Sequence, residues 1–337
     1  MTTTTPTTTS SASEPSSSGS SPDGPGGLAG LLGGIADRAA VLGVAVPVLS
    51  VLGALLVGAV LIIAEGENPL AVYTEAVQGV LTGSRGLSNT ATVATPLILI
   101  GLGYAVAYRA KVFTIGGEGQ YLIGAVAGTA WVTAAGVRDL PGPVLVVTGL
   151  VVAVVAGALW SALAGWLGVR FGANIVISSL MLVYIADSVL QWAVREGIRD
   201  PDAFIPSSRP IGDAALGELP GTHTHLGFAL AVLACPLAAW LLARHRSGYR
   251  ISALGHNAAA LDANEVRSSR IVLLVMVVAG ALAGLAGFTE TAGVNTSLGA
   301  EASVGYGWEA VIVALLGRLH PIGVLAAGLG LAGMTIG

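Results

Sequence analysis

The stretch LPGPVLVVTGLVVAVVAGALWSALAGWLGV, residues 140–169, contains no charged side chain and decides the fold class. An apolar helix of about 20 residues crosses the roughly 30 Å hydrocarbon core of a bilayer. A helix is predicted rather than a strand, because an isolated strand leaves its backbone groups unpaired in lipid. The stretch therefore predicts a membrane-spanning helix.

The composition of the whole chain agrees with this prediction. Charged residues make up 10% of the 337 residues and hydrophobic residues 54%, whereas an ordinary soluble domain has about 25% charged residues. So few charges argue against a soluble globular enzyme. A net charge of −4 argues against nucleic-acid binding. The single cysteine, Cys235, excludes a disulfide framework and a cysteine-based zinc site.

Eight further apolar runs raise the predicted number of spans to nine, in an all-α, polytopic membrane protein. The runs are 41–64, 86–108, 119–137, 171–194, 219–243, 271–289, 305–317 and 319–337. The run 305–317 is short, contains Glu309 and is the weakest of them. Because the chain stops inside an apolar run, we expect a tenth helix in the complete protein. Two glycine pairs, Gly124-x-x-x-Gly128 and Gly280-x-x-x-Gly284, predict close contacts between helices.

The distribution of Lys and Arg predicts a cytoplasmic N-terminus, because basic residues concentrate in cytoplasmic segments. With that orientation, ten of the fifteen basic residues lie inside; the reverse leaves five. The ten are Arg38, Arg109, Lys111, Arg170, Arg244, Arg246, Arg250, Arg267, Arg270 and Arg318. Residues 1–37, rich in Thr, Ser, Pro and Gly, predict a disordered cytoplasmic tail ahead of a transmembrane domain at 38–337.

Three connections have distinctive patterns. Residues 70–81 predict a short interfacial helix on the outer surface. The acidic, proline-containing loop 195–218 is expected outside; a partner contact, an entrance cover and a solvated connector all fit it. The inner loop 244–270 contains five arginines, and Asn257 is suited to cap a helix from Ala258. Docking of a soluble partner and anchoring to lipid headgroups both fit this loop.

Ionisable and polar residues within spans are functional candidates because they are costly in lipid. Three glycines surround Glu118 in FTIGGEGQ, residues 113–120, and predict a broken or loosened helix there. Glu118 then either lines a pathway or caps a helix N-terminus. Asn174, Ser178 and Ser179 suit either solute binding or helix association.

The remaining polar groups are less specific. Glu290, Asn295 and Glu301 mark either a re-entrant stretch or a plain outer loop. His223 and His225 are too few for a metal site, and none is predicted. The single lysine, Lys111, lies between Ala110 and Val112, which excludes a Gly-Lys-Ser/Thr phosphate-binding loop. Energy from ATP would therefore require a separate subunit.

Five segments, in order along the chain, resemble one family. They are FTIGGEGQYLIG (113–124), ANIVISSLML (173–182), the inner loop with Gly248, Tyr249, Arg250, Gly255 and Asn257, GALAGLAG (280–287), and Gly305-Tyr-Gly307 followed by VALLGR (313–318) and Pro321-x-Gly323. Together they resemble the permease subunits of bacterial ABC importers for branched-chain amino acids, ribose and nucleosides. The first and last segments are closest to the nucleoside or simple-sugar branch. Departures from the family pattern are Thr114, Ile175, Val183 and Glu265, in place of Asn, Glu, Asn and Gly.

The resemblance implies a permease subunit, not an enzyme, in the plasma membrane of a bacterium. It would form the translocation path for nucleosides or related simple sugars. The implied partners are a second permease subunit, identical or homologous, cytoplasmic ABC ATPases that consume ATP, and an extracytoplasmic substrate-binding protein or lipoprotein. No cofactor is implied for this chain. The alternative is a proton-coupled secondary transporter that uses Glu118, Asp187 or Glu309.

Two groups of site residues follow. The resemblance makes residues 248–261 the coupling helix for the ATPase, with Gly248, Tyr249, Arg250, Gly255, Asn257 and Ala260 as its candidates. The candidates for the translocation path are Thr114, Glu118, Gln120, Asn174, Ser178, Ser179, Glu290 and Asn295. No catalytic residue is predicted.

Overall fold

The structure is a computed structural model that describes residues 49, 52–81, 84–220, 222–258, 261 and 267–336. The predicted tail and part of the run 41–64 lie outside these residues. The chain divides into two units, residues 1–72 and 73–337. In the first unit, Leu52–Ala64 form an apolar helix. Helix α2, Pro69–Leu81, matches the short helix predicted at 70–81.

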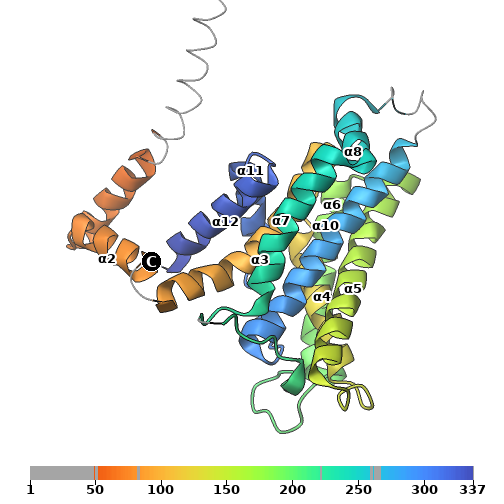
Figure 1. Ribbon diagram of the computed structural model, residues 1–337, viewed down its shortest axis with the longest axis horizontal. Coiled ribbons are helices and arrows are strands. Elements are labelled where there is room, and N and C mark those ends of the chain that lie inside the picture. The colour runs from red at the N-terminus through yellow and green to blue at the C-terminus, as the bar shows by residue number, and fades with distance from the viewer. Residues whose placement is uncertain are drawn as a thin grey trace, which may run out of the picture. The chain divides into compact units, whose positions relative to one another are not determined.

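The second unit is a bundle of helices, and its described residues contain no strand (Figure 1). Every apolar run from residue 86 onward coincides with a helix, which confirms the all-α class. The helices are α3 (Ser84–Arg109), α4 (Gly117–Val132), α5 (Gly142–Phe171), α6 (Ile175–Trp192), α7 (Leu226–Arg244), α8 (Arg246–His256), α10 (Ser268–Glu290), α11 (Tyr306–Leu316) and α12 (Pro321–Ile336). One-turn π-helices, Ala193–Gly197 and Thr291–Asn295, extend α6 and α10.

Five of these helices are long and apolar enough to cross a membrane: α3, α5, α6, α7 and α10. Helices α4 and α12 have 16 residues each and α11 has 11, which is shorter than a full span. The predicted count of nine spans and the predicted orientation therefore remain predictions.

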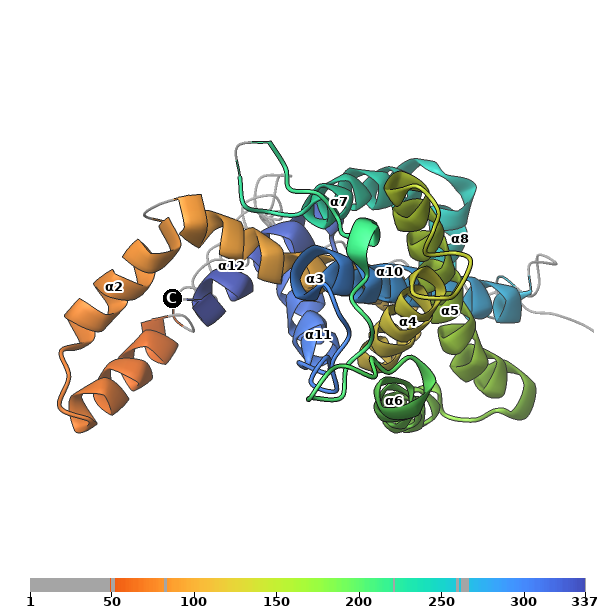
Figure 2. The same ribbon diagram turned by 90° about the horizontal axis from the view of Figure 1, so that it is seen from below.

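Helix α3 lies in the middle of the bundle (Figure 2). Its apolar window is 89% buried, whereas those of α5, α6 and α7 are 22–28% buried. A helix that is apolar on all sides belongs in an interior, while the exposed apolar faces of the outer helices suit lipid. Helices α7, α10, α11 and α12 all pack against α3.

Glycines bring α4, α5 and α10 into backbone contact, as the two glycine pairs predict. A Cβ atom on Gly124 of α4 would lie 2.3 Å from the Gly284 Cα of α10. A Cβ atom on Gly284 would lie 2.3 Å from the Ala153 carbonyl oxygen of α5, and one on Gly157 would lie 2.4 Å from the Gly280 carbonyl oxygen. Only residues without a side chain fit such short separations, and the resulting contacts stabilise helices in lipid.

The bundle has two chemically different ends. The α8 end contains α8, the C-termini of α3 and α7, the α5–α6 turn and the start of α10; these line a common cavity of about 550 Å³ or contact one another. These elements contain eight basic residues and, among the described residues, no acidic one; Asp262 and Glu265 of the inner loop lie outside the described residues. The opposite end, with residues 195–225, contains both signs of charge. This asymmetry supports the predicted cytoplasmic placement of the α8 end.

We expect Gly284→Ala to lower the thermal stability of the detergent-solubilised protein. The added methyl group would force α10 away from α5, and overpacking of this kind costs about 1–3 kcal/mol. The matched control is Gly330→Ala in α12, where a Cβ atom meets nothing within 4 Å. Equal melting temperatures for the two variants would contradict the tight packing of α10.

Candidate functional site

The segment 113–120 connects α3 to α4 inside the bundle. Residues 112–116 are not helical, as the three glycines predict, and α4 begins at Gly117. A Cβ atom on Gly116 would lie 2.9 Å from the Ser179 Cβ of α6, and one on Gly117 would lie 2.4 Å from the Tyr104 hydroxyl of α3. The Gly117 N–H donates to that hydroxyl at 2.8 Å. The first residue of α4, Gly117, thus lies beside Tyr104, which is more than one helical turn before the last residue of α3, Arg109. Helix α4 therefore starts within the bundle.

The Glu118 carboxylate binds the start of α11. Its two oxygens accept hydrogen bonds from the Ser303 hydroxyl (3.1 Å), the Gly305 N–H (3.2 Å) and the Gly307 N–H (2.6 Å). A Cβ atom on Gly307 would lie 2.1 Å from the Glu118 nitrogen, so the two helix N-termini touch. The side chain of Glu118 thus satisfies N–H groups that a helix leaves free at its N-terminus.

Glycine is also required where α11 begins. Gly305 has φ 95°, a left-handed conformation that directs the chain into α11. The preceding residues form an irregular connection, in which Leu298 exchanges hydrogen bonds with Ser208, and Gln191 of α6 donates to the Ala300 carbonyl. The weak eighth run is thus an 11-residue helix that follows an irregular segment.

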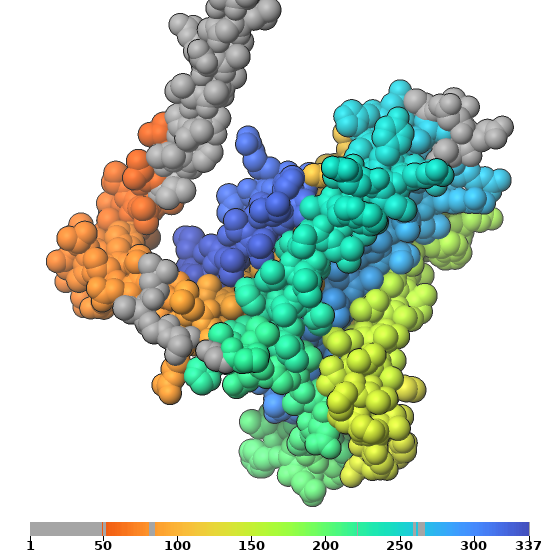
Figure 3. Space-filling model, viewed as in Figure 1, coloured from red at the N-terminus to blue at the C-terminus, as the bar shows by residue number. Residues whose placement is uncertain are grey.

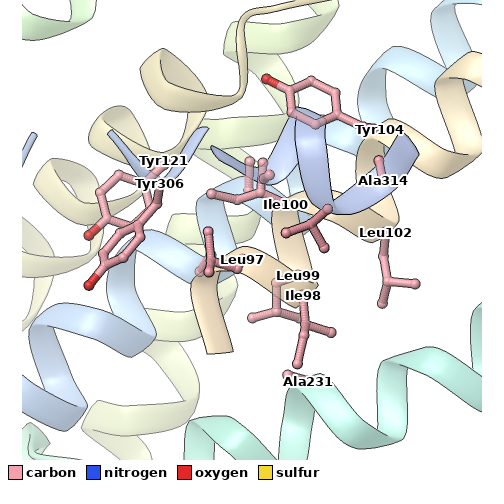
Figure 4. Close-up of a cluster of buried hydrophobic side chains, with 14 of the residues drawn as sticks. Leu97, Ile98, Leu99, Ile100, Leu102, Tyr104, Tyr121, Ala231, Tyr306 and Ala314 are labelled. Atoms are coloured by element: carbon pink, nitrogen blue, oxygen red, sulfur yellow. The ribbon is translucent and has the colours of Figure 1, made fainter. Parts of the chain in front are cut away.

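A second carboxylate lies beside the first residue of α11. Glu290, at the end of α10, lies close to Tyr306, and its buried oxygen Oε2 has no hydrogen-bond partner among the described residues. The rings of Tyr306 and Tyr121 are 6.0 Å apart and nearly perpendicular (Figure 4). Two consecutive residues at the start of α11, Tyr306 and Gly307, thus lie next to two buried carboxylates, and Gly307 donates to one of them.

The path candidates form one cluster and several separate positions. Thr114, Glu118, Gln120 and Ser179 are buried around segment 113–120; Gln120 donates to Ser161 of α5, and Ser179 accepts from the Ile115 N–H.

The other four path candidates lie elsewhere. Asn174 is exposed at the α8 end, where its side chain caps α6 and lines the cavity of about 550 Å³. Ser178 is half-buried on α6, Glu290 lies beside Tyr306, and Asn295 is exposed at the last residue of the α10 extension. The structure therefore brings half of these candidates together.

The helix α8 lies on the C-termini of two other helices. A Cβ atom on Gly248 would lie 2.4 Å from the Leu242 carbonyl oxygen of α7, and one on Gly255 would lie 2.1 Å from the Arg109 carbonyl oxygen of α3. Ile251 and Leu254 are buried on the same face. Gly248 and Gly255 hold α8 against the bundle, and they are not exposed to a partner.

The outer face of α8 is open to solvent (Figure 3). Tyr249 is 77% exposed, and Arg250 is exposed beside it. Asn257 follows the last residue of α8 as its C-cap. Ala260 and most of the helix expected from Ala258 lie outside the described residues. Among the described coupling candidates, Tyr249, Arg250 and Asn257 are exposed, and the first two lie side by side on α8.

Several structural residues escaped sequence analysis. Tyr104 binds segment 113–120 from 13 positions earlier in the chain, and Ser303 binds it from 185 positions later. Helix α8 begins at Arg246, ahead of the expected helix. The spacing of its buried Gly248, Ile251 and Gly255 is helical and is the signal that would have found it.

The histidine pair lies at the opposite end. His225 caps α7 by accepting from the Gly227 N–H at 3.1 Å, and burial lowers its pKa. The Nδ1 atom of His223 lies 3.8 Å from the Oε2 atom of Glu218. Within the described part of the chain, no three metal-ligating residues form a cluster.

Comparison with known proteins places the chain among transport proteins. Residues 86–336 match the family described as branched-chain amino acid transport system / permease component. A glucose ABC transporter permease protein of Haloferax volcanii is 34% identical over 86% of this chain and 79% of its own length. A guanosine ABC transporter permease protein of Bacillus subtilis and a nucleoside ABC transporter permease protein of Lactococcus lactis are each 30% identical, covering 87% and 85% of the chain and 84% and 81% of their own lengths. No solved structure matches.

We expect Glu118→Gln to lower the melting temperature of the detergent-solubilised chain. An amide has one acceptor oxygen and places an NH₂ donor against the N–H groups of α11, so at least one buried donor loses its partner, at about 1–3 kcal/mol. Glu301→Gln is the matched control, because Glu301 is exposed on the neighbouring connection. If both variants melt at the wild-type temperature, Glu118 does not hold α11.

Proposed function

Since this chain belongs to the family of branched-chain amino acid transport system permease components, we propose that it forms the translocation path for nucleosides or related simple sugars. It is a membrane permease subunit of an ABC importer and not an enzyme. Membership implies ATPase, substrate-binding and second permease components. The solutes printed for three relatives, glucose, guanosine and nucleosides, support the proposed solute class.

One observation supports the transport role most directly: the half-length helix α11 starts inside the bundle, at Glu118. Discontinuous helices expose backbone groups and helix ends within a membrane domain, where solutes and ions bind in many transporters. In our proposal, the path runs beside the start of α11 and the cluster of Thr114, Glu118, Gln120 and Ser179. The exposed Ser303 hydroxyl and the half-buried Glu309 supply polar groups next to this cluster.

We propose that α8 and the residues up to Leu261 couple the permease to a cytoplasmic ATPase. The exposed Tyr249 and Arg250 support docking, because Tyr and Arg are enriched among residues that dominate protein interfaces. The concentration of basic residues at the α8 end supports a cytoplasmic location. Lipid anchoring is the alternative for this surface, and the membership in an importer family favours docking.

The opposite end would then face the outside and receive the substrate-binding protein. It has a polar cavity of about 580 Å³ lined by Arg138 and Arg209 and by Asp200, Asp202 and Asp213. Most of these residues belong to the acidic connection between α6 and α7 and suit contact with a polar protein surface. We assign the chain to a bacterial plasma membrane.

The solute class is tested by reconstituting the permease with its ATPase and binding protein in proteoliposomes. We expect ATP-dependent uptake of radiolabelled guanosine or of a simple sugar such as ribose or glucose, competed by unlabelled members of that class and not by leucine. Uptake of leucine alone would overturn the solute assignment. Uptake driven by a pH gradient without the ATPase would support the proton-coupled alternative instead.

We expect Tyr249→Ala with Arg250→Ala to weaken ATPase binding by roughly tenfold or more, because each residue type often contributes over 1 kcal/mol at an interface. The permease itself is expected to fold normally, since both side chains are exposed. Binding is measured by titrating the ATPase onto permease in nanodiscs. Arg138→Ala at the opposite end is the control, and an unchanged affinity of the double variant would exclude this face of α8 as the docking site.

A further inference from the structure

Arg109, the last residue of α3, contacts two elements that move or act in transport under the proposed function. Its carbonyl oxygen lies under Gly255 of α8, at a separation that leaves no room for a Cβ atom. Its side chain extends the other way, and Nε donates to the Leu319 carbonyl oxygen at 3.1 Å. Leu319 lies in the short turn between α11 and α12. One residue therefore connects α8 to the half-length helix α11.

The backbone around this contact is strained. Among the described residues, four that are not glycine have positive φ, and three of them are here: Lys111 (φ 55°), Arg318 (φ 53°) and Leu319 (φ 57°). Such conformations persist where surrounding contacts enforce them, and they cluster at switch regions. The α11–α12 turn is also tight, because a Cβ atom on Gly323 would lie 2.3 Å from the Gly317 carbonyl oxygen.

Helix α11 is thus held at both ends. Glu118 binds its N-terminus in the bundle, and Arg109 binds the turn after its C-terminus. A displacement of α8 would act on the end of α3 and, through the guanidinium, on this turn. The turn cannot absorb much of the displacement, because Gly317, Gly323 and Val324 are in backbone contact.

We propose that Arg109 is a positioning residue that transmits the movement of α8 to α11 and so couples ATP hydrolysis to opening of the solute path. The proposal rests on the proposed function, in which α8 receives the ATPase. It adds a specific route: α8, the end of α3, the α11–α12 turn, and α11 with its contact at Glu118. A two-state element that both sites bias is what such a coupling requires.

The first test compares variants of the reconstituted importer. We expect Arg109→Ala to bind the ATPase with wild-type affinity and to hydrolyse ATP, while solute uptake per ATP falls by roughly tenfold, a loss in the usual range for a removed coupling. Arg109→Lys retains a donor for the Leu319 carbonyl and should restore most of the uptake. Arg318→Ala is the matched control, because Arg318 is an exposed arginine in the same turn. The proposal would be overturned if Arg109→Ala kept the wild-type uptake per ATP. It would also be overturned if the variant lost as much affinity for the ATPase as it lost uptake per ATP.

The second test needs no folded Arg109 variant. Spin labels at Ile312 of α11 and Leu159 of α5, both exposed, report the distance between these helices in the complete importer. We expect this distance to change when the ATPase is trapped with ATP and vanadate. The proposal would be overturned if the distance between the labels on α11 and α5 stayed the same while the distance between a label pair on α8 and α5 changed. ATP-dependent uptake by the same wild-type sample tests the proposed function separately.

Discussion

The interaction between the Glu118 carboxylate and the N-terminus of α11 determines how the second half of the bundle is built. A helix that starts inside an apolar bundle exposes N–H groups that water does not reach, and each unpaired group is costly. The carboxylate satisfies two of them and also binds Ser303. Because α11 starts there, it reaches the α8 end after only 11 residues. The irregular connection before α11 and the tight turn after it both follow from this starting point.

Around that contact, glycines set the distances between helices. Gly124, Gly157, Gly280 and Gly284 allow α4, α5 and α10 to touch along their backbones. Such contacts replace the hydrophobic driving force that is absent between helices in lipid. The result is a closely packed frame of long helices. Helices α8 and α11 have 11 residues each, and glycines hold them against this frame near their ends, at Gly248 and Gly255 of α8 and at Gly307 of α11.

The sequence predicted the individual helices well, because the apolar runs are long and the breaks contain glycine or charge. It also predicted the break at 113–120 and the importance of Glu118, since three adjacent glycines and one acid are unusual in an apolar setting. It did not predict that Glu118 binds Ser303 and Gly307, because those partners are 185 and 189 positions away and local pattern does not report such contacts. Gly248 and Gly255 were predicted as residues of the coupling helix, but the sequence did not predict that they pack inward against α7 and α3, because it does not distinguish a closely packed glycine from an exposed one.

The separation between Glu118 and its partners has a consequence for biosynthesis. Residue 118 enters the membrane early, while Gly307 is synthesised 189 positions later. Until then, the nascent bundle contains a carboxylate that has no donor from α11. Without residues 303–307, the three hydrogen bonds that the Glu118 carboxylate accepts from Ser303, Gly305 and Gly307 cannot form. The hydrogen bonds that position α11 therefore form only after residue 307 has been synthesised.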